Sequence, residues 1–200
     1  MRSKSGLLVF CLMASAITAS CSTTPDKCVP PKLLECENAD LHGADLRGAY
    51  LITANFKNAN LIGANLTSAN LTNADLTGAT LTGANLTSAN LYEAKFIGAE
   101  LSGSNLRGAE LYATNFIDAN LKGSNLTGTN LTDTNFTGAD LSFANLSGAR
   151  TSTLGGAVVT DANLTGANLT DSDIEFTDMT GAVLTDAVMP DGTIFTQPSS

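Results

Sequence analysis

The stretch SNLTGTNLTDTNFTGADL, residues 124–141, places a large apolar residue at every fifth position. An amphipathic helix would bury residues three and four apart, and a half-buried strand would alternate apolar and polar residues, so neither period fits. The spacing therefore indicates a tandem repeat with a unit of five residues.

The five-residue register extends over about half of the chain. Every fifth residue from Leu41 to Leu146 is Leu or Phe, without exception. The residue two positions earlier is small, mostly Ala, and the residue between them is usually Asn or Asp. The last two positions of the unit are typically Thr followed by Gly, Ser, Asn or Asp, which favour turns. Each unit is thus expected to bury one large and one small side chain and then to bend.

Longer intervals indicate how many units complete one turn of such a coil. Several like residues recur twenty positions apart or at a multiple of twenty: Phe56, Phe96, Phe116 and Phe136, and Tyr92 with Tyr112. Twenty residues are four units, so the coil should have four sides. The four phenylalanines should then form a core ladder on one inner face, with adjacent turns about 4.8 Å apart, as neighbouring strands are.

These tandem A(D/N)LxG-like units resemble those of the pentapeptide-repeat proteins. The resemblance covers residues 39–189 and implies an all-β fold, a right-handed quadrilateral parallel β-helix. At four units per turn, the repeats give about seven turns. It implies little about activity, because most members of that family lack an assigned biochemical role. One group of members protects bacterial DNA gyrase from quinolones by imitating a DNA duplex in shape and charge.

The register is interrupted once. Thirteen residues separate Leu146 from Val159, where the pattern resumes, and thirteen is not a multiple of five. A short bulge or loop at residues 152–156 is the simplest explanation, with its glycines supplying backbone freedom. The loop could bind a partner, because loops on repeat scaffolds often do. We favour the alternative, an insertion that the fold tolerates and that has no role.

Residues 1–20 have the features of an export signal: two basic residues, then an apolar run, then small residues. Thr18–Cys21 resembles the bacterial lipobox, in which the Cys becomes the lipid-modified first residue, although Thr18 stands where that pattern prefers Leu or Val. The resemblance implies a protein anchored to a membrane through lipid at Cys21, in the outer membrane if the cell has one. Cleavage after Ala16 is the alternative and would release a soluble secreted or periplasmic protein.

Two further cysteines precede the repeats, Cys28 and Cys36. In an oxidising compartment they are predicted to form a disulfide. Residues 21–38 would then serve as a tether and as a cap on the open end of the solenoid. The chain has a single histidine, His42, and no second pair of cysteines in this region, so we expect no metal site and no cofactor.

The formal net charge is −9, and no Lys or Arg follows Arg150. The acidic residues Asp171, Asp173, Glu175 and Asp178 are therefore a candidate interaction surface, a column of carboxylates that could imitate nucleic-acid phosphates for a partner such as DNA gyrase. The interpretation favoured by an export signal is that these charges keep the protein soluble. The negative charge disfavours binding to nucleic acid itself.

Catalysis is not expected, because His42 has no partner suggested by spacing and the interior should be filled by Leu, Phe and Ala. Residues 190–200 should cap the last turn, or alternatively join two molecules end to end as a homodimer. The sequence thus predicts a non-enzymatic, exported, lipid-anchored β-solenoid that offers an interaction or structural surface to an unidentified protein partner in the bacterial envelope.

Overall fold

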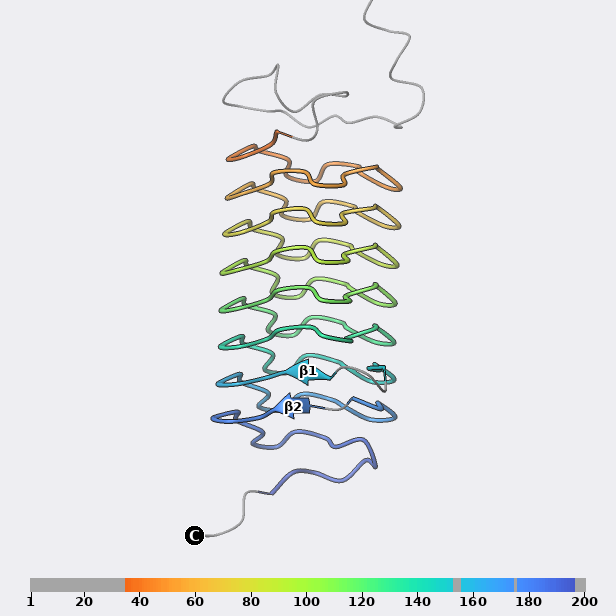
Figure 1. The fold of residues 1–200 in the computed structure, drawn as a ribbon, viewed down its shortest axis with the longest axis vertical. Coiled ribbons are helices and arrows are strands. Elements are labelled where there is room, and N and C mark those ends of the chain that lie inside the picture. Colours follow the sequence, from red (N-terminus) through yellow and green to blue (C-terminus); the bar gives the residue numbers. More distant parts are fainter. Residues whose placement is uncertain (1–34, 153–155, 175, 197–200) are drawn as a thin grey trace, which may run out of the picture.

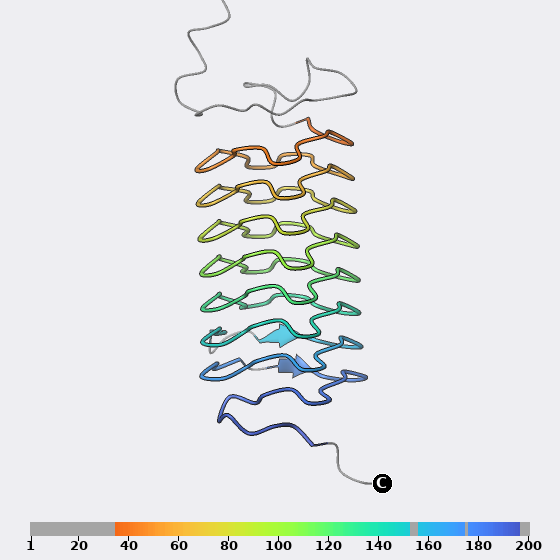
Figure 2. The same cartoon turned by 180° about the vertical axis from the view of Figure 1, so that it is seen from behind.

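The computed structural model describes residues 35–152, 156–174 and 176–196. In these ranges the chain winds into a stack of coils, which begins at residue 35 and ends near the C-terminus (Figure 1, and from behind in Figure 2). Parallel β-bridges join residues twenty positions apart, from Glu35 with Asn55 to Asn130 with Arg150. One coil therefore contains four five-residue units, and the fold is a β-solenoid.

Backbone hydrogen bonds hold each coil to the next. The Leu41 N–H donates to the Asn60 carbonyl at 2.7 Å, and the Asn60 N–H donates to the Ala39 carbonyl at 2.8 Å. A further bond, from the Ala44 N–H to the Leu41 carbonyl at 3.0 Å, closes the turn within the unit. The same bonds recur along the chain, so the structure pairs its backbone as a sheet does although most bridges are isolated.

The Asn or Asp of the unit satisfies an N–H that the stacking of coils does not reach. Asn65 accepts the N–H of Thr67 through Oδ1 at 3.1 Å, and Asn125 accepts that of Thr127 at 3.1 Å. The threonine hydroxyl donates to the same oxygen, at 2.7 Å and 2.6 Å respectively. Most units with Asn or Asp at this position form this Asx turn, which explains why the sequence favours these two residues.

Most units bend at a residue with positive φ, which lies just before the next small inward residue. The angle is 64° at Gly43, 53° at Asn58 and 56° at Asp118. Positive φ at the third residue of a turn is typical of type II turns and favours Gly and Asn. Phe143 adopts a φ of 58° at this position, which is uncommon for a bulky residue, and its side chain is 63% exposed.

The inward residues form four columns, and each column defines one side of the coil. We name the sides after their first core residue: the Cys36 side, the Leu41 side, the Leu46 side and the Leu51 side. All Leu and Phe residues of the five-residue register from Leu41 to Leu146 are buried, as are nearly all the small residues two positions earlier. The predicted inward register is confirmed for this part of the chain.

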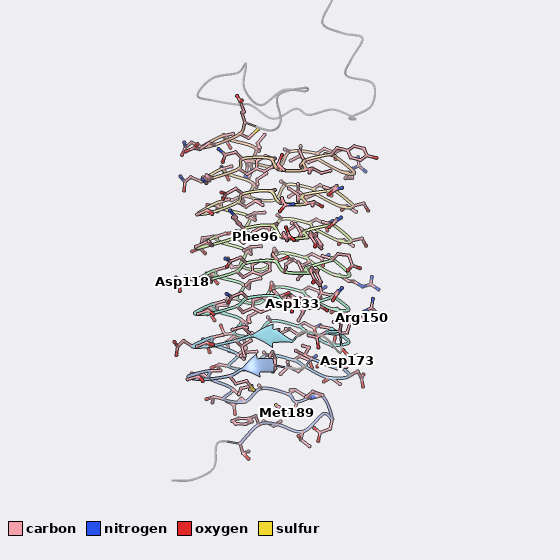
Figure 3. The ribbon with its side chains drawn as sticks, in the orientation of Figure 1. Phe96, Asp118, Asp133, Arg150, Asp173 and Met189 are labelled. Carbon is pink, nitrogen blue, oxygen red and sulfur yellow. The ribbon has the colours of Figure 1, made fainter. Side chains whose placement is uncertain are left out.

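The phenylalanines lie in one column, on the Cys36 side. The rings of Phe96 and Phe116 stack with centroids 4.9 Å apart, and those of Phe116 and Phe136 with centroids 5.2 Å apart. Phe96, labelled in Figure 3, is fully buried. Leu76 separates Phe56 from Phe96 in the column, so the continuous aromatic stack contains three rings and Phe56 is outside it.

The interruption adds three residues to one coil. Asn130 pairs with Arg150, twenty positions on, whereas Asn135 pairs with Val158, twenty-three positions on. Two short strands follow, β1 (Ala157–Val158) and β2 (Phe176–Asp178), which pair in parallel with an irregular register. Residues 153–155, within the predicted loop at 152–156, lie outside the described residues. Val159 is buried next to Phe136 in the column, so the extra residues are absorbed before the core resumes.

The chain folds back on itself at the C-terminal end. Val188 pairs antiparallel with Ile194, the Met189 N–H donates to the Thr193 carbonyl at 2.7 Å, and the Phe195 N–H donates to the Ala187 carbonyl at 2.7 Å. Phe195 packs against the core, while Ile194 is 61% exposed. Phe195 therefore covers part of the last coil, as a cap would.

A few small inward positions carry hydroxyl groups. The Thr114 and Thr134 hydroxyls donate to the carbonyls of Leu91 and Leu111 at 2.8 Å. The hydroxyls of Ser104, Ser124 and Ser172 are also buried, but within the described residues they have no hydrogen-bond partner. The extra methyl group of threonine fixes its rotamer and directs its hydroxyl to a carbonyl, and the serine side chains lack that constraint.

We expect Phe116→Ala to lower the free energy of unfolding by about 3 to 5 kcal/mol, because it removes the middle ring of the stack and leaves a cavity. Phe116→Leu should cost only about 1 kcal/mol, because Leu76 fills the same column. Urea denaturation of the two variants and the parent would measure both values. Equal losses in the two variants would contradict the role of the ring stack.

We expect Ser124→Ala to raise the free energy of unfolding by about 1 kcal/mol, because it removes a buried hydroxyl that lacks a partner and leaves the residue found in most units. Thr134→Ala is the matched control and should lower it by about 1 kcal/mol, because its hydroxyl bonds to the Leu111 carbonyl. Thermal melts of both variants test the pair, and a destabilising effect of Ser124→Ala would show that the hydroxyl has a partner.

Candidate interaction surface

One of the cysteines with a predicted role lies within the described residues. Cys36 occupies the first inward position of the column that continues with Phe56, and it is fully buried. Cys21 and Cys28 lie outside the described residues. Lipid attachment at Cys21 and the disulfide between Cys28 and Cys36 therefore stay predictions.

The described residues of the candidate acidic surface lie on different sides of the coil. Asp171 lies at a turn of the Leu46 side, and Asp173 lies on the Leu51 side, where its backbone pairs with that of Arg150 in the preceding coil (Figure 3). Asp178 ends β2 on the Cys36 side, and Glu175 is outside the described residues. Because the side changes every five residues, Asp171, Asp173 and Asp178 do not belong to one column, and their use as an interaction surface stays a hypothesis.

Carboxylates instead surround the C-terminal end of the solenoid. The described acidic residues beyond the interruption whose side chains are placed are Asp161, Asp171, Asp173, Asp186 and Asp191. Their register distributes them over all four sides, and every Lys and Arg in the described ranges lies at or before Arg150. The negative charge of this end is therefore not directed toward any one side.

The Leu46 side presents a ladder of asparagines with little freedom to bind a partner. The outward position of six successive coils holds Asn65, Asn85, Asn105, Asn125, Asn145 and Asn168. The Oδ1 atoms of all six accept backbone N–H groups of their own turns. The amide oxygens on this side therefore serve the fold.

The Leu51 side differs, because all three tyrosines of the chain lie on it. The rings of Tyr92 and Tyr112 stack with centroids 5.1 Å apart and an interplanar angle of 8°. Tyr50, in the first coil, is 85% exposed, and Ile52 beside it is 43% exposed. This side therefore combines aromatic and aliphatic surface that the solvent reaches.

The sequence alone identifies Tyr92 and Tyr112 only as members of the twenty-residue period, and it does not single out Tyr50 or Ile52. The same twenty-residue period groups them. Two coils are forty residues, so position 50 shares its column with position 90, and Ile52 shares its column with Tyr92. Sorting outward residues by side, rather than by their order along the chain, would have found this surface.

Carboxylates lie beside both stacked tyrosines. A hydrogen bond to Glu93 raises the pKa of Tyr92, and a hydrogen bond to Asp133 raises the pKa of Tyr112. In each case the neighbouring negative charge also opposes ionisation of the phenol. Asp133 is labelled in Figure 3. The corner of the coil after the Leu51 side therefore joins aromatic rings to acidic groups.

Residues 35–152, 156–174 and 176–196 give no support for a metal site or a membrane-spanning helix. No group of three His, Cys, Asp or Glu side chains there is arranged to hold a metal ion. No helix in the same ranges has the length and apolar character needed to cross a bilayer. His42 is exposed on the Leu41 side, where its backbone N–H donates to the Asp40 carboxylate at 3.2 Å.

Comparison with known families agrees with the geometry of the coil. The sequence profile described as pentapeptide repeats matches residues 35–73, 69–108, 114–150 and 152–186, in 8 copies. These segments span more than half of the chain. The chain belongs to the pentapeptide-repeat family. The family assignment agrees with the repeat, whereas it does not test the expected export or lipid anchor.

Solved structures of other pentapeptide-repeat proteins are similar to this chain. HetL, involved in heterocyst differentiation regulation in the cyanobacterium Nostoc sp., is 28% identical over 80% of this chain and 89% of its own, with a TM-score of 0.27. A protein of the Arabidopsis thaliana thylakoid lumen is 28% identical over 57% and 67%, with a TM-score of 0.21. QnrB1, a plasmid-mediated fluoroquinolone resistance protein, is 23% identical over 77% and 81%, with a TM-score of 0.30. The comparison with curated proteins gave no match.

We expect Glu93→Gln to lower the pKa of Tyr92 toward its ordinary value, because the neutral amide removes the negative charge that opposes ionisation. Asp133→Asn should do the same for Tyr112. An alkaline titration followed by NMR of ring-labelled tyrosines would resolve the residues. Glu100→Gln, on the Leu41 side, is the control and should leave both pKa values unchanged. Unchanged values in Glu93→Gln and Asp133→Asn would rule out these hydrogen bonds.

Proposed function

We propose that this protein is a non-enzymatic solenoid that is exported, anchored by lipid at Cys21, and used as a rigid interaction surface in the bacterial envelope. The observation that carries this proposal is the filled interior. Leu, Phe and Ala side chains occupy the inward positions and are buried from coil to coil. Specific recognition is therefore left to the outward side chains.

The exposed polar groups support a binding role over a catalytic one. Catalytic acids and bases usually lie in clefts that shift their pKa values. The lowered pKa values of two described acids come from local turn contacts: hydrogen bonds from Thr193 lower the pKa of Asp191, and a hydrogen bond from Arg47 lowers that of Asp45. Both contacts join residues two positions apart in sequence, so they are local to a turn.

Export and lipid attachment are supported by the sequence that precedes the solenoid. The first twenty residues have the order of an export signal, and Cys21 follows small residues as in a lipobox. Thirteen residues separate Cys21 from residue 35. Extended, they reach at most about 45 Å, so a lipid at Cys21 would keep the solenoid close to the membrane surface.

We expect the parent chain, expressed in a bacterium, to fractionate with membranes and to begin at a Cys21 that carries diacylglycerol, as intact-mass spectrometry would show. Cys21→Ser should lose both the lipid mass and the membrane association, because the thiol is the site of attachment. Cys11→Ser, within the signal, is the control and should behave as the parent does. A product cleaved after Ala16 would remove the lipid anchor, and an uncleaved cytoplasmic chain would remove export as well.

A second candidate function is imitation of DNA for a DNA-binding protein such as gyrase. Its support is the C-terminal end, where acidic residues occur on every side with no Lys or Arg among them. The distribution over four sides fits a DNA-like track less well than one column would. An uncleaved cytoplasmic chain in the fractionation experiment would favour this candidate over the first.

A further inference from the structure

We propose that the Leu51 side binds a basic segment of a protein partner, rich in Arg or Lys. The site is a tyrosine surface made of Tyr50, Ile52, Tyr92, Tyr112, Glu93 and Asp133. The inference deepens the proposed role as an interaction surface, and it does not depend on export or on the lipid anchor.

The fold does not require aromatic residues at these positions. Thr72 and Thr132 occupy the same corner position as Tyr92 and Tyr112 in neighbouring coils, and they complete their turns with Asx hydrogen bonds. Tyr92 is nevertheless 39% exposed, and its ring is held parallel to that of Tyr112. Exposed tyrosines contribute strongly to protein interfaces because they offer a large apolar area with little conformational entropy to lose.

The placement of the aromatic residues is selective. All three tyrosines lie on one side, and Ile52 extends the same patch in the first coil. Among the described residues, the other exposed aromatic residue is Phe143, which lies at a corner of the Leu41 side with the Lys122 ammonium 5.9 Å from its ring centroid. Phe143 thus already has a cation over its ring, whereas Tyr92 and Tyr112 have carboxylates beside theirs.

The acidic groups of the tyrosine surface are not neutralised within the part of the chain that the structure describes. Ion pairs there join Arg47 to Asp45 at 2.6 Å and Lys57 to Asp75 at 3.2 Å, and neither involves Glu93 or Asp133. Glu110 adds a third exposed carboxylate on the same side, and Arg150, two coils beyond Glu110 in the same column, is the exposed cation of that side among the described residues. A partner that binds the tyrosine surface should therefore carry positive charge.

Arginine and lysine side chains can bind both the aromatic rings and the carboxylates of the tyrosine surface. A guanidinium or ammonium group is attracted to an aromatic face, and arginine also binds a carboxylate through two hydrogen bonds. From Tyr50 in the first coil to Tyr112 in the fourth is about 14 Å, at about 4.8 Å per coil. An extended peptide covers that length with about four residues, so a short basic segment could contact the whole surface.

The direct test is binding of a fluorescein-labelled peptide of alternating Arg and Gly to the purified full-length chain, followed by fluorescence anisotropy at low salt. The same peptide with Gln in place of Arg is the control ligand. We expect the Arg peptide to bind and the Gln peptide not to bind. Absence of binding by the Arg peptide would overturn the proposal.

The aromatic contribution is tested by the double variant Tyr92→Thr/Tyr112→Thr, which copies the residues of neighbouring coils and keeps the charge. We expect it to weaken binding of the Arg peptide about tenfold, through loss of two cation–π contacts. Unchanged affinity, in a variant whose circular dichroism matches the parent, would overturn the proposal.

The location of the site is tested by a pair of charge-matched variants. Glu93→Gln/Asp133→Asn should weaken binding about tenfold by removing charge-assisted hydrogen bonds. Asp171→Asn/Asp191→Asn removes the same charge from the Leu46 side and should have a much smaller effect. Equal losses would show that only net charge matters and would overturn the site.

A neutral ligand is the competing occupant. Binding of an uncharged chitin oligosaccharide that depends on Tyr92 and Tyr112, but not on Glu93 and Asp133, would overturn the proposal in favour of a glycan. The fractionation experiment has no bearing on these outcomes, so loss of the export proposal and loss of this inference can be told apart.

Discussion

Backbone hydrogen bonds between successive coils are the interaction on which the rest of this structure depends. They repeat every twenty residues, and together with the turn bonds they use four of the five N–H groups of a unit, as around Leu61. The fifth is accepted by an Asn or Asp side chain, as Asn65 accepts that of Thr67. A residue's place in the unit therefore decides whether it faces the core, a neighbouring coil or the solvent.

The core could be predicted from the sequence because burial leaves a direct mark on residue type. Leu or Phe at every fifth position identified the inward residues, and the spacing of Phe96, Phe116 and Phe136 identified the four-sided coil. The function of the intervening Asn or Asp could not be predicted from hydropathy, because it is a backbone hydrogen bond. The number of extra residues at the interruption, three, follows from the pairing of Asn135 with Val158, twenty-three positions on.

The candidate site was less predictable, for a geometric reason. Asp171, Asp173 and Asp178 are close in sequence, but the coil turns a corner between them, so closeness along the chain does not mean a shared surface. Tyr50 and Tyr112 are far apart in sequence yet lie on one side. On this fold, the position of a residue within the twenty-residue period decides which surface it joins. Its neighbours in sequence do not. The roles of Cys21 and Cys28 rest on sequence alone.

The two periods have separate consequences for how such a chain can change in length. Gain or loss of one five-residue unit would keep every later Leu inward, but it would turn all later side chains by a quarter of a circuit about the long axis. Tyrosines after the change would then lie on a different side of the coil from those before it. Gain or loss of a whole coil changes only the height of the stack. The three residues added near the interruption preserve this angular order, because Val159 still follows Phe136 in its column. The core thus tolerates any multiple of five, whereas the pattern of the surface survives only multiples of twenty or a loop that is absorbed locally.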